Sequence, residues 1–63
     1  MWIVIYLMKG YEAVRMLKEK LEDKGILVMI RCKSEDENKE EAFYEILVPQ
    51  TEAEQAQTLL ICQ

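Results

Sequence analysis

The sequence predicts a small α+β domain in which three strands and two helices follow one another in the order βαββα. Runs rich in β-branched and aromatic residues cover residues 2–8, 26–33 and 42–48, as is typical of strands. After the first and third runs, apolar residues recur three and four positions apart, which indicates helices with one buried face. Because 63 residues leave room for one domain only, we expect residues 1–63 to form a single unit.

Residues 2–8 are expected to form the first strand. The run is too short to cross a membrane and lacks the basic start and cleavage site of a signal peptide, so we expect a cytoplasmic protein without a membrane partner. Both faces of this strand are apolar, as in strands that are covered on both sides. Simple alternation puts Trp2, Val4 and Tyr6 on one face and Ile3, Ile5 and Leu7 on the other.

Residues 11–24 are expected to form the first helix. Its opposite face is charged, and two pairs four residues apart, Arg15 with Glu19 and Lys18 with Glu22, can meet on the surface. Gly25 follows the last turn, where a left-handed residue often ends a helix. The buried stripe is predicted to contain Ala13, Val14, Leu17 and Leu21, with Met16 at its flank.

Residues 26–33 and 42–48 are expected to form a hairpin. The intervening stretch SEDENKEE, residues 34–41, has no apolar residue and is expected to be a mobile, solvated loop. Pro49 ends the third strand because proline has no backbone N–H to donate. Thr51 and Glu54 match the capping-box pattern, so we expect a cap at Thr51 and a final helix over residues 52–61. Its inward stripe is predicted to be Ala53, Ala56, Leu59 and Leu60.

Connection rules then favour a ferredoxin-like arrangement. The first strand, first helix and second strand form a βαβ unit, and the hairpin places the third strand between the first two. Both helices cover one face of this three-stranded sheet. The fourth strand of a full ferredoxin-like fold is missing, so an apolar edge at the first strand is expected to need cover.

The whole chain resembles the DUF2007 family of short bacterial proteins, which are described as prokaryotic signal-transducing proteins. The resemblance rests on MWIVIYL, AVRMLKEKLEDKGILVMIR and YEILVPQTEAEQAQTLL. It implies a βαββα, ferredoxin-like or PII-like fold and a signalling role, and it supplies no catalytic residues. Some similar proteins carry the label glutamate decarboxylase, but that chemistry normally uses pyridoxal phosphate in a large enzyme.

Several kinds of site can be weighed from composition. The sequence has no histidine and only two cysteines, Cys32 and Cys62, which excludes Cys–His zinc sites and Cys–His or Ser–His nucleophiles. The net charge of −4 gives no reason to bind a phosphate backbone, so no nucleic-acid partner is expected. Arg31 and Lys33 either hold a phosphate or carboxylate ligand or balance nearby acids, and the second interpretation is favoured.

Two further sets of side chains admit a binding and a structural interpretation, and the structural one is favoured for both. The acidic loop offers oxygens for a divalent cation but lacks the glycine and spacing of a calcium-binding loop. The aromatic residues could form a stacking platform for bases, yet the accompanying basic residues are missing. The loop oxygens belong to Asp36, Glu37, Asn38, Glu40 and Glu41, and the aromatic set is Trp2, Tyr6, Tyr11, Phe43 and Tyr44.

The sequence therefore predicts no catalytic, cofactor-binding or metal-binding residue, and no enzyme. We expect a regulatory or interaction domain that forms a homodimer and docks on an unidentified protein. The alternative is a sensor that binds a small molecule at the dimer cleft. The dimer is expected because a chain this short buries a small core, about 60% of its unfolded surface, and because the first strand leaves apolar surface to be covered.

Overall fold

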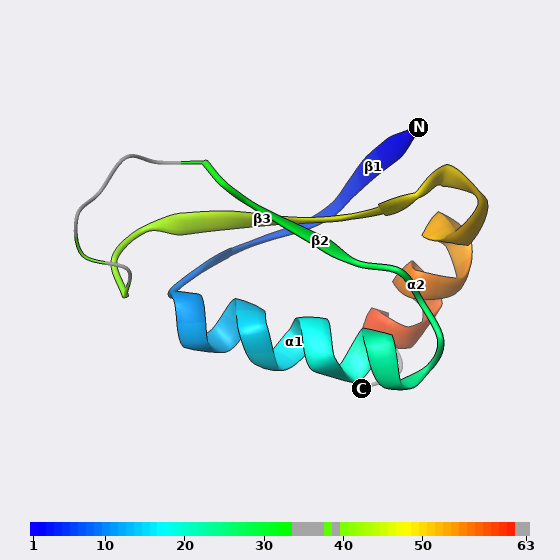
Figure 1. Cartoon of the computed structure of the whole chain (residues 1–63), viewed down its shortest axis with the longest axis horizontal. Coiled ribbons are helices and arrows are strands. Elements are labelled where there is room, and N and C mark those ends of the chain that lie inside the picture. The colour runs from blue at the N-terminus through cyan, green and yellow to red at the C-terminus, as the bar shows by residue number, and fades with distance from the viewer. Residues whose placement is uncertain (34–37, 39, 62–63) are drawn as a thin grey trace.

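The computed structural model describes residues 1–33, 38 and 40–61, and it confirms the small α+β fold. The expected loop over residues 34–41 therefore lies largely outside the described residues. The elements follow the predicted βαββα order, with one short 3₁₀ turn added before the last helix (Figure 1). They are β1 (Trp2–Lys9), α1 (Tyr11–Asp23), β2 (Met29–Cys32), β3 (Phe43–Pro49), the turn η1 (Gln50–Glu52) and α2 (Ala53–Ile61).

The three strands form one sheet in the order β1-β3-β2. The central strand β3 is antiparallel to both neighbours, so β1 and β2 run parallel to each other. This confirms the prediction that the third strand inserts between the first two. Each outer strand pairs on one side only within the described part of the chain.

Both helices lie on the same side of the sheet (Figure 1). The core sits between the two layers, and its largest fully buried side chains are Leu21, Ile46, Val14 and Val48. Ala56 of α2 is fully buried as well, and Ala53, Leu59 and Leu60 pack against the core as predicted.

Helix α1 buries Val14, Leu17 and Leu21, whereas the predicted stripe residue Ala13 is exposed. The helix ends at Asp23, and Gly25 follows it with a φ of +83°, which lies in the left-handed region. The Gly25 N–H donates to Glu22 O and the Ile26 N–H to Leu21 O, which together form a Schellman motif. Because Ile26 is still bonded to the helix end, the second strand begins at Met29 and not at residue 26 as predicted.

Strand β1 contains a bulge that the alternation pattern did not predict. Val4 lies opposite Leu47 and Tyr6 lies opposite Ile46, so Ile5 is an extra residue in the ladder. Ile5 packs against the core, and Tyr6 follows it onto the helix-covered side because its partner Ile46 is a core residue. The predicted grouping of Tyr6 with Trp2, and of Leu7 with Ile5, is therefore wrong beyond the bulge.

The predicted capping box at Thr51 is also wrong. Thr51 lies inside the 3₁₀ turn η1, which starts after Pro49 and has no side-chain cap hydrogen bond. The turn is held by backbone contacts instead: the Gln50 N–H donates to Met1 O at 2.8 Å, and the Ala53 N–H donates to Gln50 O. The carboxylate of Glu52 accepts a hydrogen bond from the Leu27 N–H at 3.3 Å, which ties the turn to the segment before β2.

Candidate functional site

The side of the sheet that faces away from the helices carries a surface that we call the open face. Tyr44, Ile46 and Val48 of β3 belong to the core between the sheet and the helices. Because side chains alternate along a strand, the residues between them point to the opposite side of the sheet. Residues directly opposite on neighbouring strands share a face. The open face comprises Trp2, Val4, Leu7 and Lys9 of β1, Met29 and Arg31 of β2, and Phe43, Glu45, Leu47 and Pro49 of β3.

The open face is largely apolar. Leu47 at its centre is 3% exposed although no described helix covers it, because Val4 and Met29 lie directly opposite it on either side. The surrounding side chains are much more accessible to water, since Trp2, Val4, Leu7, Met29 and Phe43 are between 38% and 48% exposed. A contiguous apolar surface of this kind marks an interaction site more often than a solvated face.

One end of the open face is charged. The Arg31 Nε donates a hydrogen bond of 2.8 Å to Oε1 of Glu45, which lies opposite it on β3. Lys33 Nζ lies 4.0 Å from the other oxygen of the same carboxylate. On the opposite edge strand, β1, Lys9 Nζ pairs with Glu41 at 2.8 Å. Both signs of charge therefore occur together at this end.

Glu45 is the most enclosed charge of this group. Its side chain is 12% exposed, whereas that of Arg31 is 59% exposed. The hydrogen bond from Arg31 lowers the pKa of Glu45 below its ordinary value, although burial alone would raise this pKa. Arg31 and Lys33, the residues considered as a ligand site, therefore lie beside an acid, as the favoured interpretation predicted.

A second candidate is a groove of about 780 Å³ between α1 and β2. Two tyrosines stand at its wall: the rings of Tyr11 and Tyr44 meet edge to face with centroids 5.6 Å apart. Burial raises the pKa of the Tyr44 phenol, and nearby Cys32 adds to the effect. The exposed Cys32 lies at the end of β2 and also lines the groove.

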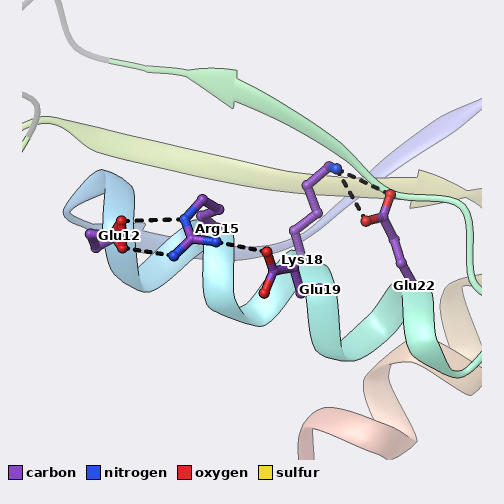
Figure 2. A network of polar contacts seen from close by, with 5 residues as sticks. All are labelled: Glu12, Arg15, Lys18, Glu19 and Glu22. Atoms are coloured by element: carbon purple, nitrogen blue, oxygen red, sulfur yellow. Dashed lines mark hydrogen bonds and ion pairs between the residues drawn. The ribbon is translucent and has the colours of Figure 1, made fainter.

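The rim of this groove on α1 carries a row of paired charges (Figure 2). The three nitrogens of the Arg15 guanidinium donate to Glu12 and Glu19, at distances between 2.7 and 3.3 Å. Lys18 pairs with Glu22 one turn further on, at 3.1 Å. The Arg15 hydrogen bond lowers the pKa of Glu12. The predicted pairs are confirmed, and an anion entering the groove meets cations that are already paired with carboxylates.

The five aromatic residues do not form the stacking platform that was considered. Trp2 and Phe43 lie on the open face, while Tyr6 and Tyr44 lie on the helix-covered side of the sheet. Tyr11 belongs to α1. The structure brings Tyr11 and Tyr44 together at the groove.

The acidic residues considered as a cation site are only partly described. Asn38 accepts hydrogen bonds from the backbone N–H groups of Glu40, Glu41 and Ala42, which builds a turn ahead of β3. Asp36 and Glu37 lie outside the described residues. Within the described ranges, no group of three histidine, cysteine or acidic side chains is arranged to hold a metal ion.

The described helices are also all too short or too polar to cross a bilayer.

Sequence reasoning did not identify the open face as a site. The alternation of Phe43, Glu45 and Leu47 indicated that β3 has a second face. The alternation of β1 did not place Leu7 on that face, because the bulge at Ile5 shifts the register.

No match was found when the chain was compared with protein-family models, curated proteins and solved structures. The resemblance to the signal-transducing family therefore stays a prediction.

Proposed function

We propose that this protein is a non-enzymatic regulatory or interaction domain of the cytoplasm that works as a homodimer. The observation that supports the proposal is the open face, on which five apolar side chains are about two-fifths to half exposed around the buried Leu47. A signalling role, as the family resemblance implies, fits a domain whose candidate site is a surface for binding other proteins.

The energetics favour covering this surface. A chain of 63 residues buries only about 60% of its unfolded surface when it folds alone. Each Å² of apolar surface that a partner removes from water contributes about 25 cal/mol before the cost of association. Covering the open face therefore adds a second apolar layer to a domain that has one thin core.

The charged side chains support a binding role over a catalytic one. Arg15, Lys18 and Arg31 each pair with a carboxylate, and the lowered pKa values of Glu12 and Glu45 follow from those pairs. A catalytic acid or base is usually poised near neutral pH. The pKa values of Glu12 and Glu45 are shifted away from neutral pH, so these carboxyl groups are poorly suited to that task.

The decisive measurement is sedimentation of the purified chain at micromolar concentration. We expect a species of twice the monomer mass of 7.5 kDa. Val4→Lys places a charge at the apolar end of the open face and should shift the protein to monomer. Met16→Lys is the matched control, since Met16 is also an exposed apolar residue but belongs to α1; this variant should remain dimeric.

A single 7.5 kDa species for the unaltered chain would contradict the homodimer. Equal loss of the dimer in Val4→Lys and Met16→Lys would contradict the open face as the dimer interface. Far-UV circular dichroism of both variants checks that each remains folded, so that a change in mass reports on association.

The groove between α1 and β2 supports a second candidate, a small-molecule sensor. Its volume of about 780 Å³ suits a metabolite, and the Tyr11–Tyr44 pair offers aromatic surface and two phenols. A ligand that binds the folded state raises the melting temperature by mass action. A thermal-shift screen of metabolites should identify a stabilising compound if this candidate is right, and Tyr11→Ala should abolish its effect.

A further inference from the structure

The open face is divided along the strands into two unlike halves. Trp2, Val4 and Met29 surround Leu47 and Pro49 at the end where β3 finishes. The charged pairs Arg31–Glu45 and Lys9–Glu41 occupy the end where β3 begins, beside the apolar Leu7 and Phe43. A partner surface that matches this division must therefore be apolar over one half and carry both charges over the other.

A second copy of the chain meets this requirement in one orientation only. A two-fold axis parallel to the strands stacks apolar half on apolar half and charged half on charged half. A two-fold axis across the strands sets each apolar half against charges, which lose their water without gaining partners. Symmetric pairing of a surface with itself is the commonest form of association among soluble proteins.

We propose that a second copy covers the open face about a two-fold axis parallel to β3, so that Arg31 of each copy contacts the partner's Glu45. This inference rests on the proposed homodimer and deepens it. Facing sheets pack about 10 Å apart, with β3 over the partner's β3 and β1 over the partner's β2. The carboxylates of the two copies then lie near the axis, with a guanidinium on either side.

The side chain of Arg31 is suited to this double role. It is 59% exposed while it holds Glu45, which is 12% exposed. A guanidinium has five N–H donors in a planar fork, so it can serve one carboxylate in its own chain and another across an interface. Because the axis repeats each contact, two Arg31 residues and two Glu45 residues form one alternating cluster.

The dimensions of the chain limit the size of this interface. The Cα atoms extend 33 Å along the longest axis and 16 Å along the shortest, and Figure 1 shows the strands running along the longest axis with the sheet seen from its edge. Side chains widen this footprint further. An interface on the open face is therefore expected at or below the roughly 800 Å² per partner that standard interfaces bury.

The edges of the sheet suit a second copy less well than the open face does. The bulge at Ile5 interrupts the regular register of β1, and bulges twist an edge away from further pairing. Strand β2 has only four residues. A continuous sheet across two copies therefore has little regular edge to build on.

Two charge-reversed variants test the contact. Arg31→Glu leaves only acids at the centre of the cluster, and Glu45→Arg leaves only bases. Each variant alone should dimerise at least about tenfold more weakly than the unaltered chain, because like charges meet at the axis. An equimolar mixture should recover the dimer as a heterodimer, because the acidic copy then faces the basic one.

The outcomes separate this inference from the homodimer itself. An unaltered chain that is dimeric, with a mixture that stays monomeric, overturns the Arg31 contact and leaves the homodimer standing. Variants that dimerise as strongly as the unaltered chain overturn the contact too. An unaltered chain that is monomeric removes the homodimer and this inference together, and leaves a different protein as the occupant of the open face.

A measurement on the unaltered chain covers the case in which a reversed variant fails to fold. In a dimer of isotope-labelled and unlabelled copies, intermolecular nuclear Overhauser effects report which side chains face each other. The proposed axis brings Val4 close to the partner's Met29. Contacts of Val4 with the partner's Leu7 and Lys9 would instead indicate the axis across the strands and overturn the proposal.

Discussion

Arg31 and Glu45 lie opposite each other on β2 and β3, and the Arg31 Nε donates a 2.8 Å hydrogen bond to the Glu45 carboxylate. The pair stands on the side of the sheet that the helices leave uncovered. It lowers the pKa of Glu45 although the carboxylate is mostly enclosed. Loss of the arginine therefore leaves a mostly buried charge with a weaker neighbour, Lys33 at 4.0 Å.

We expect Arg31→Gln to raise the pKa of Glu45, as measured by NMR titration of its side-chain carboxyl. Because the folded-state pKa of Glu45 lies below the ordinary 4.5, the pair stabilises the fold above that pH, and the stabilisation is lost as the pH falls through the lowered pKa. The variant should therefore unfold at a higher pH during acid titration. Lys33→Gln is the control and should shift the pKa of Glu45 less.

Arg15→Gln removes the centre of the charge row on α1. We expect a lower melting temperature at low salt, because Arg15 holds Glu12 and Glu19 at once and its loss leaves these acids along one helix face. The difference should shrink in about 1 M salt, where charges on the surface are screened within about 3 Å. A difference that persists at high salt would indicate that packing, and not charge, is responsible. Lys20→Gln on the same helix is the matched control.

Thr51→Ala should change the free energy of unfolding by less than about 0.5 kcal/mol, the usual range for a surface substitution. A helix cap at this position would make the same change cost about 1 kcal/mol. Thr51 is exposed and lies within the 3₁₀ turn, so we expect the smaller value in chemical denaturation. Gly25→Ala serves as a sensitive comparison: it should cost about 1–2 kcal/mol, because its φ of +83° is left-handed.

The arrangement of the fold could be predicted from the sequence because each element has a local signal. The spacing of Val14, Leu17 and Leu21 predicts a helix, and Gly25 predicts its end. The order of the strands then follows from connection rules. The bulge at Ile5 and the turn at Thr51 could not be predicted, since both depend on backbone contacts between distant segments, such as the hydrogen bond from Gln50 to Met1 O.

The candidate site was less predictable than the fold. The sequence indicated that apolar surface on the first strand needs cover, but alternation placed Leu7 with the residues that include Ile5. Only the register of β1 on β3 shows that Leu7 lies opposite Glu45 and shares its face with Val4. The pairing of Arg31 with Glu45 likewise depends on the register of β2 on β3, which local sequence patterns do not determine.

Substitution of two leucines, one in the core and one on the open face, tests whether a second copy covers the open face. Leu21 is 1% exposed beneath the sheet, whereas Leu7 is 48% exposed on the open face. Leu21→Ala should cost about 2–5 kcal/mol at any protein concentration, because it leaves a cavity in the core. Leu7→Ala should cost little when the chain is dilute and monomeric. Its cost should grow as concentration rises, because association stabilises the folded state by mass action. Thermal unfolding at nanomolar and micromolar protein distinguishes the two, and a cost for Leu7→Ala that is independent of concentration would show that no second copy covers this residue.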